Sequence, residues 1–146
     1  MSNTVNDTWI KQPIAGGSSN EYVYQCTMEW NQPSDDSNHT EIISPKFIWK
    51  VDSDFVVFVN YKAVDTSTSA DVVMHIYGSI DNTNKIDMVT AQTITNANFD
   101  GKIYKYLYDV STNGIAPVMY VSLDPSADLG AVDIDVAVFP NARRPD

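Results

Sequence analysis

The sequence predicts an all-β protein: a single antiparallel β-sandwich, jelly-roll-like, with about eight strands. Three observations support this. Apolar and polar residues alternate with a period of two. Clusters of Asn, Asp, Gly and Ser separate the alternating stretches. No window combines a sustained helical period with a capping signature. At 146 residues, the chain has the size of one domain that can bury a real core.

The first twenty residues differ from the rest. They are rich in Asn, Thr, Gly and Ser, and they predict a flexible N-terminal arm over residues 1–20, followed by a sandwich domain over residues 21–146. The arm carries three large apolar residues, Trp9, Ile10 and Ile14. We expect these residues to contact a partner, because an arm that orders on a neighbour gains contact area there.

The remaining elements follow in chain order. The expected strands cover residues 21–30, 46–51, 55–64, 71–80, 85–94, 103–110, 115–123 and 131–139. Turns are expected at 81–84, 98–101 and 109–114, where Asp and Asn can hydrogen-bond their own backbone. The last strand shows the clearest pattern. Its apolar face holds Val132, Ile134, Val136 and Val138, and its polar face holds Asp133 and Asp135. Pro140 ends it, because proline has no N–H for the ladder.

A row of tyrosines marks the strand at 103–110. Tyr104, Tyr106 and Tyr108 face one way, while Lys105 and Asp109 face the other. Because charged residues disfavour their own face as core, the tyrosines are expected to line the sandwich interior or a subunit contact. The alternative is an outward aromatic platform for a sugar or a protein partner.

The composition excludes several classes of partner. The net charge is −10 and no basic stripe exists, so we expect neither nucleic-acid binding nor attachment to an anionic membrane. The start of the chain lacks the pattern of a signal peptide, which predicts a protein made in the cytoplasm and not secreted by that route. The single cysteine, Cys26, cannot form an internal disulfide and is expected to be a small buried residue.

Catalytic chemistry is scarce. With two histidines, one cysteine and no nucleophile or phosphate-binding motif, the sequence predicts neither an enzyme nor a cofactor or metal site. Asp133 and Asp135 have a spacing found in glycosidases, but a strand face in water favours a simple solvated pair. The segment Asp124–Asp128, with Asp135 in twelfth place, partly matches a calcium loop. Leu129 stands where that loop needs glycine, which favours an acidic turn.

Three stretches carry a family resemblance. They are residues 72–89, with Gly78-Ser79 before an Asp/Asn/Thr turn, residues 108–123, with Asn113-Gly-Ile-Ala-Pro117, and the closing strand 132–138. Together they resemble small β-sandwich structural proteins of tailed bacteriophage virions. The resemblance implies a capsid decoration or cement protein on the virion surface, often trimeric, that contacts capsid or other virion proteins.

Two functional hypotheses therefore stay open. The first is a virion structural protein that acts through protein–protein contact as a homo-oligomer, with Trp9, Ile10, Ile14 and the tyrosine row as partner-binding residues. The alternative is a carbohydrate-binding or receptor-binding β-sandwich module, which would show exposed aromatic rings beside Asp or Asn.

Overall fold

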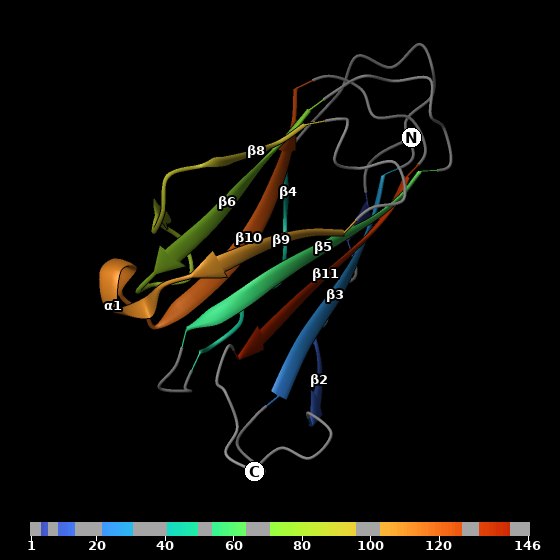
Figure 1. The fold of residues 1–146 in the computed structure, drawn as a ribbon. Helices are drawn as coiled ribbons and strands as arrows, with labels where there is room; N and C mark the ends of the chain where they lie inside the picture. The colour runs from blue at the N-terminus through green and yellow to red at the C-terminus, as the bar shows by residue number, and fades with distance from the viewer. Residues whose placement is uncertain are drawn as a thin grey trace.

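A computed structural model describes residues 4–5, 9–13, 22–30, 41–49, 54–63, 71–95, 103–126 and 132–140. These residues form eleven strands and one short helix, and every strand pairing among them is antiparallel. The strands build two sheets (Figure 1). The predicted all-β antiparallel sandwich is confirmed.

The six-stranded sheet contains the longest strands. Its order is β1-β3-β11-β5-β9, with β2 also paired to β3. The bounds are β1 Thr4–Val5, β2 Ile10–Pro13, β3 Tyr22–Trp30, β5 Phe55–Ala63, β9 Ile103–Tyr108 and β11 Val132–Pro140. β11 is central, because it pairs with β3 on one side and β5 on the other.

The five-stranded sheet has the order β4-β10-β6-β7, with β8 also paired to β6. The bounds are β4 Ile42–Ile43, β6 Val72–Ser79, β7 Ile86–Asp87, β8 Gln92–Ile94 and β10 Val118–Pro125. From β3 onward, the chain changes sheet at every connection except those joining β6, β7 and β8. This repeated crossing is the jelly-roll-like connectivity that the sequence predicts.

The core lies between the inward faces of the two sheets. Val72, Met74 and Ile76 of β6 are fully buried, as their alternation predicts. They meet buried residues of the other sheet in one cluster, which includes Phe55, Val57, Val59, Ile134, Val136 and Val138. At one end of this cluster, the Tyr108 ring stacks on Phe55 with centroids 4.3 Å apart. The same residues that define the strand periods therefore hold the sheets together.

A flexible arm is expected over residues 1–20, but the described residues 4–5 and 10–13 pair with the sandwich. β1 and β2 both add to β3, and Trp9 lies in the core at 9% exposure. Its indole N–H donates to the carbonyl of Pro45, and its ring meets Phe47 edge-on at 5.5 Å. The physical reason is the large apolar area of one tryptophan, which favours burial even beside polar neighbours.

Two expected strands are broken, each for a local reason. In place of a strand over 46–51, the structure has β4 and an isolated bridge from Phe47 to Met119, while residues 50–51 lie outside the described residues. Pro45 stands at the break, because it has no N–H to donate. The expected strand over 85–94 divides into β7 and β8, and Val89 is buried between them.

The turn at 109–114 contains one helical turn, α1 (Val110–Asn113). The Asp109 carboxylate caps it by accepting hydrogen bonds from the backbone N–H groups of Ser111 and Thr112, at 2.9 and 3.2 Å. Gly114 follows with φ 74°, a conformation that glycine adopts without a Cβ clash. The sequence predicts the chain reversal here but not the helical turn.

Candidate functional site

The outward side of the five-stranded sheet gathers polar and aromatic side chains. Since Met74 and Ile76 point into the core, the alternation of β6 turns His75 and Tyr77 outward. The cross-strand partner of His75 is Ser122 on β10. We call this surface the polar face and define it by six residues: Glu41, His75, Tyr77, Asp87, Ser122 and Asp124.

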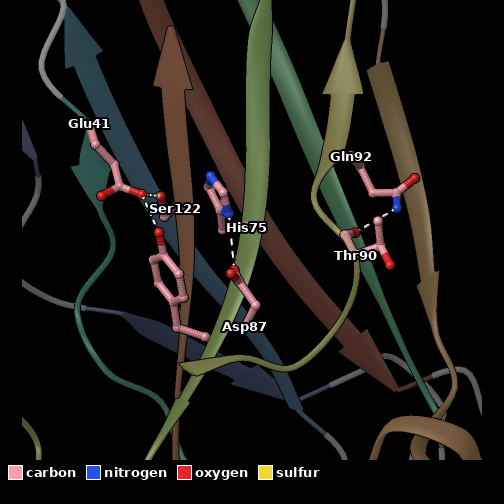
Figure 2. Close-up of polar contacts among 7 residues, drawn as sticks. Glu41, His75, Asp87, Thr90, Gln92 and Ser122 are labelled. Atoms are coloured by element: carbon pink, nitrogen blue, oxygen red, sulfur yellow. Dashed lines mark hydrogen bonds and ion pairs between the residues drawn. The ribbon is translucent and has the colours of Figure 1, made fainter. Parts of the chain in front are cut away.

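His75 and Asp87 form an ion-pair contact on this face. The Nδ1 atom of His75 lies 3.1 Å from Oδ1 of Asp87, which comes from β7 (Figure 2). The His75 side chain is 18% exposed and that of Asp87 is 55% exposed. The imidazole also stacks on the ring of Tyr77, with centroids 5.2 Å apart and planes 9° from parallel. These two contacts fix the orientation of the imidazole.

Glu41 accepts two hydroxyl hydrogen bonds on the same oxygen, Oε2. The phenol of Tyr77 donates at 2.6 Å, and the hydroxyl of Ser122 donates to the same atom (Figure 2). Ser122 is fully buried even though it belongs to the outward side of the sheet. Burial, and then the hydrogen bond to Glu41, raise the pKa of Tyr77 well above its usual range. Tyr77 therefore stays a neutral donor to this carboxylate.

Asp124 completes the polar face. It lies two residues beyond Ser122 on β10, so its side chain projects on the same side of the sheet. One ligand-type atom from each of Glu41, His75 and Asp124 lies within 4.8 Å of the other two. Three separate segments of the chain thus bring an imidazole and two carboxylates together.

A third aromatic ring extends the same face. Tyr120 is the cross-strand partner of Tyr77. The ammonium of Lys85 lies over the Tyr120 ring, 4.7 Å from its centroid, in a cation–π contact. His75, Tyr77 and Tyr120 therefore place three neighbouring rings beside both acidic and basic groups.

The arrangement does not make a nucleophile. A serine, a histidine and an aspartate do meet on this face, because Ser122 lies opposite His75 and His75 contacts Asp87. The hydroxyl of Ser122 donates to Glu41, however, and its side chain is fully buried. Acyl transfer needs that hydroxyl to be exposed and bonded to the imidazole. Ser122 is therefore not placed as a nucleophile on the polar face.

The outward side of the six-stranded sheet carries a group of apolar side chains next to the charged Lys105 and Asp135. Phe58 and Phe139 meet edge-on, with centroids 5.2 Å apart. Ile103 and Leu107 on the edge strand β9 are 60% and 49% exposed. The strand register places all four on one side of the sheet. We call these four residues the apolar face.

The structure separates the partner-binding residues expected in the arm. Trp9 is in the core, as described above, and Ile10 is 49% exposed. Ile14 lies outside the described residues. A partner contact through these residues stays a prediction.

The tyrosine row points inward, as its opposite face predicts. Tyr108 is fully buried, its hydroxyl donates to the carbonyl of Gly114 at 2.5 Å, and burial raises its pKa to about 12. Tyr104 and Tyr106 are partly buried and pack against the core. Burial raises the pKa of both phenols. The interior reading of the row is therefore the one that the structure shows, while a subunit contact stays a prediction.

Several expected features lie beyond the described parts of the chain. Residues 127–131, which include Asp128, are not described, and neither are the side chains of Cys26 and Asp133. Asp135 lies on the outward side of β11, which belongs to the other sheet than the polar face. The polar face itself was not predicted. The alternation that turns His75 outward was its only signal, because the sequence does not reveal which strand lies beside β6.

No helix in the described part of the chain is long and apolar enough to cross a membrane. No family model matches the sequence. No curated protein matches it either.

Solved structures with a similar fold do exist. One, titled "CBM4 structure and function", is 16% identical, with 92% of this chain and 88% of that chain covered and a TM-score of 0.49. A carbohydrate-binding module, CBM28, specific for non-crystalline cellulose, is 12% identical over 92% of this chain and 77% of its own, with a TM-score of 0.45. The xylan-binding domain CBM22-1 of Paenibacillus barcinonensis Xyn10C is 11% identical, with 98% of this chain and 88% of that chain covered and a TM-score of 0.44. At these values, the likeness concerns the β-sandwich fold alone.

Proposed function

We propose that this protein is a carbohydrate-binding β-sandwich module that holds its ligand on the polar face without catalysing a reaction. One observation carries the proposal: three neighbouring aromatic rings and three carboxylates lie together on the outward side of one sheet. The sequence leaves open an alternative with aromatic rings beside acidic groups. In the fold, His75 and Tyr77 are partly exposed and Tyr120 is buried beside them.

The chemistry of the face suits a sugar. Sugar hydroxyls donate hydrogen bonds to carboxylates, and Asp87 and Asp124 offer acceptor oxygens to solvent. The apolar C–H side of a pyranose packs against aromatic rings, which Tyr77 and His75 provide. Few precisely placed polar groups among rings are typical of small-ligand sites.

The face is also preorganised. Glu41, just before β4, is held by hydroxyls from β6 and β10, and His75 of β6 is held by a carboxylate from β7 and a ring from β6. Side chains that are already fixed lose little conformational freedom on binding, so more of the contact energy appears as affinity. This favours specific recognition of a ligand with a fixed pattern of hydroxyl groups.

The test is calorimetric titration of the full chain with soluble oligosaccharides of cellulose, xylan and laminarin. Cellulose and xylan are chosen because two of the similar structures are a cellulose-specific module and a xylan-binding domain. We expect one of these to bind, and Tyr77→Ala to weaken the binding by at least about tenfold, which corresponds to roughly 1.4 kcal/mol. Tyr77→Phe keeps the ring and loses the bond to Glu41, so its affinity should lie between those of the unaltered protein and Tyr77→Ala.

The matched control is Leu107→Thr on the apolar face. It should bind as tightly as the unaltered protein, because Leu107 lies on the other sheet. Circular dichroism checks that each variant is folded. If no oligosaccharide binds, or if Leu107→Thr weakens binding as much as Tyr77→Ala does, the proposal is wrong.

A second function is favoured by the apolar face. The exposed Ile103 and Leu107 lie on the same side of one sheet as the partly buried pair Phe58 and Phe139, and exposed apolar side chains grouped in this way are typical of a surface that contacts protein. We propose self-association through this face as the second candidate, which fits the homo-oligomeric structural protein, trimeric in the virion, that the family resemblance implies. A virion location itself stays a prediction from the sequence.

A further inference from the structure

We propose that the polar face holds a divalent transition-metal cation, of the Zn²⁺ or Mn²⁺ class, with Glu41, His75 and Asp124 as its ligands. This inference goes beyond sugar binding and does not require it. Among the described residues, these three bring their ligand atoms within 4.8 Å of one another. They come from the residue before β4, from β6 and from β10, so the sheet itself sets their spacing.

The spacing is close to that of a bound ion. Ligands about 2.1 Å from a zinc ion lie roughly 3.4 Å from each other in tetrahedral geometry. The ligand atoms here lie at most 4.8 Å apart and so need to approach by up to about 1.4 Å, which a change of side-chain rotamer on a half-buried surface supplies without moving a strand.

Two of the ligands have free lone pairs. Both hydroxyl bonds to Glu41 end on Oε2, so Oε1 accepts no hydrogen bond from any described residue. Within the part of the chain that the structure describes, the carboxylate of Asp124 has no hydrogen bond or ion pair, although its side chain is half-buried. Half-buried carboxylates normally acquire a partner, and a cation supplies one.

His75 is arranged as a metal ligand would be. Its Nδ1 atom contacts Asp87 at 3.1 Å. When Nδ1 donates its proton to that carboxylate, the lone pair remains on Nε2, the atom free to bind a metal. Histidines that bind metals usually donate their other ring N–H to a carboxylate in this way, which fixes the ring and raises its basicity. Asp87 would then act on the metal through His75.

The local charge also favours a cation. Glu41 and Asp124 are two like charges close together, and among the described residues no Lys or Arg forms an ion pair with either. Lys85 is placed instead over the ring of Tyr120. The repulsion between two carboxylates at this separation costs free energy that a divalent ion between them would offset.

The ligand set selects the kind of metal. Calcium and magnesium prefer oxygen ligands throughout, whereas an imidazole nitrogen suits zinc and other first-row transition metals. Three protein ligands on an outward sheet face leave coordination positions open toward solvent. Water or an oxygen atom of a ligand would fill them.

The experiment is calorimetric titration of the chelator-treated full chain with ZnCl₂, MnCl₂ and CaCl₂, with no sugar present. We expect Zn²⁺ or Mn²⁺ to bind with one ion per chain, and Ca²⁺ to bind at least about tenfold more weakly. Asp124→Asn should weaken binding by more than about tenfold, because it removes a charged ligand. Asp87→Asn, which leaves all three ligands in place, should weaken it by roughly tenfold to a hundredfold.

Asp135→Asn is the matched control. It removes the same charge from the outward side of the other sheet and should bind metal as the unaltered protein does. Absence of binding, or equal affinity in Asp124→Asn and in the unaltered protein, overturns the proposal. Because no sugar is present, either result leaves the carbohydrate-binding proposal to its own titration.

Discussion

The two outward faces of the sandwich obey the same alternation but hold different side chains. On the five-stranded sheet, the outward positions hold the hydrogen-bonded groups of the polar face, including the fully buried Ser122. On the six-stranded sheet, the outward positions hold Phe58, Phe139 and the exposed Ile103 and Leu107. The period of two decides which residues enter the core, and function depends on the residues that the core leaves out.

The two faces also differ in the kind of interaction that contributes to their free energy. The polar face depends on a few directional bonds that converge on Glu41, so the loss of one bond leaves this charged group with one donor in place of two. The apolar face depends on area, which is lost gradually as side chains become smaller. Substitutions should therefore act sharply on one face and gradually on the other.

The largest effect is expected from Ser122→Val. The hydroxyl that donates to Glu41 disappears and a bulkier side chain enters a fully buried position. We expect a loss of about 2–3 kcal/mol in the free energy of unfolding, from the missing bond and from overpacking. For a domain of this size, the melting temperature should fall by roughly 5–10 °C, measured by calorimetry.

The control for that substitution is Thr93→Val on the exposed edge strand β8, whose melting temperature should change little. If both variants have the same melting temperature as the unaltered protein, the hydrogen bond of Ser122 does not stabilise the polar face. The comparison between a directional face and an area-based face would then lose its main evidence.

The sequence was sufficient for the interior of the fold. Val72, Met74 and Ile76 are buried as their period predicts, and the tyrosine row turns inward because Lys105 occupies the other side. Trp9 was not predicted to be in the core, because one aromatic residue among polar neighbours gives no period. Its position depends on contacts with Phe47 and the carbonyl of Pro45, distant in the chain.

The polar face was beyond sequence reasoning for a related reason. Its members are separated by up to 83 positions, from Glu41 to Asp124, and they meet only because β10 lies between β4 and β6. Strand order in a sandwich is set by the packing of the whole chain, so no local motif records it. The sequence places Asp124 in a loop-type calcium motif, whereas in the structure its ligand-type atom groups with those of the distant Glu41 and His75.

A middle-sized effect is expected on the apolar face. The double variant Ile103→Thr/Leu107→Thr removes exposed apolar area at β9 and touches no residue of the polar face. We expect the unaltered protein to self-associate and the double variant to associate at least about tenfold more weakly, roughly 1.4 kcal/mol, as measured by light scattering over a concentration series.

The melting temperature of this double variant should stay nearly constant, because both side chains are exposed. A monomeric unaltered protein at high concentration would contradict the second candidate function. The apolar face would then have no proposed function to set against that of the polar face.

The smallest expected effect is a dependence of the melting temperature on pH. It comes from a turn next to the polar face. The turn after β6 is held by the Asp81 carboxylate, which accepts hydrogen bonds from the backbone N–H groups of Asn84 and Thr83 at 2.8 and 2.9 Å. These bonds, with one from the amide side chain of Asn84, hold the pKa of Asp81 well below its ordinary value of 3.8. The same turn leads into β7 and so positions Asp87.

The sign of the effect follows from linkage. Because the pKa of Asp81 is lower in the folded state, its contribution to stability is present above the unfolded value of 3.8 and is lost as the pH falls below it. Between about pH 4 and pH 2, the melting temperature of Asp81→Asn should therefore decline less steeply than that of the unaltered protein. Asn84→Ala keeps the carboxylate and loses the 2.7 Å side-chain bond, so its slope should be intermediate. Equal slopes in all three proteins would show that the hydrogen bonds of Asp81 do not contribute to the dependence of stability on pH.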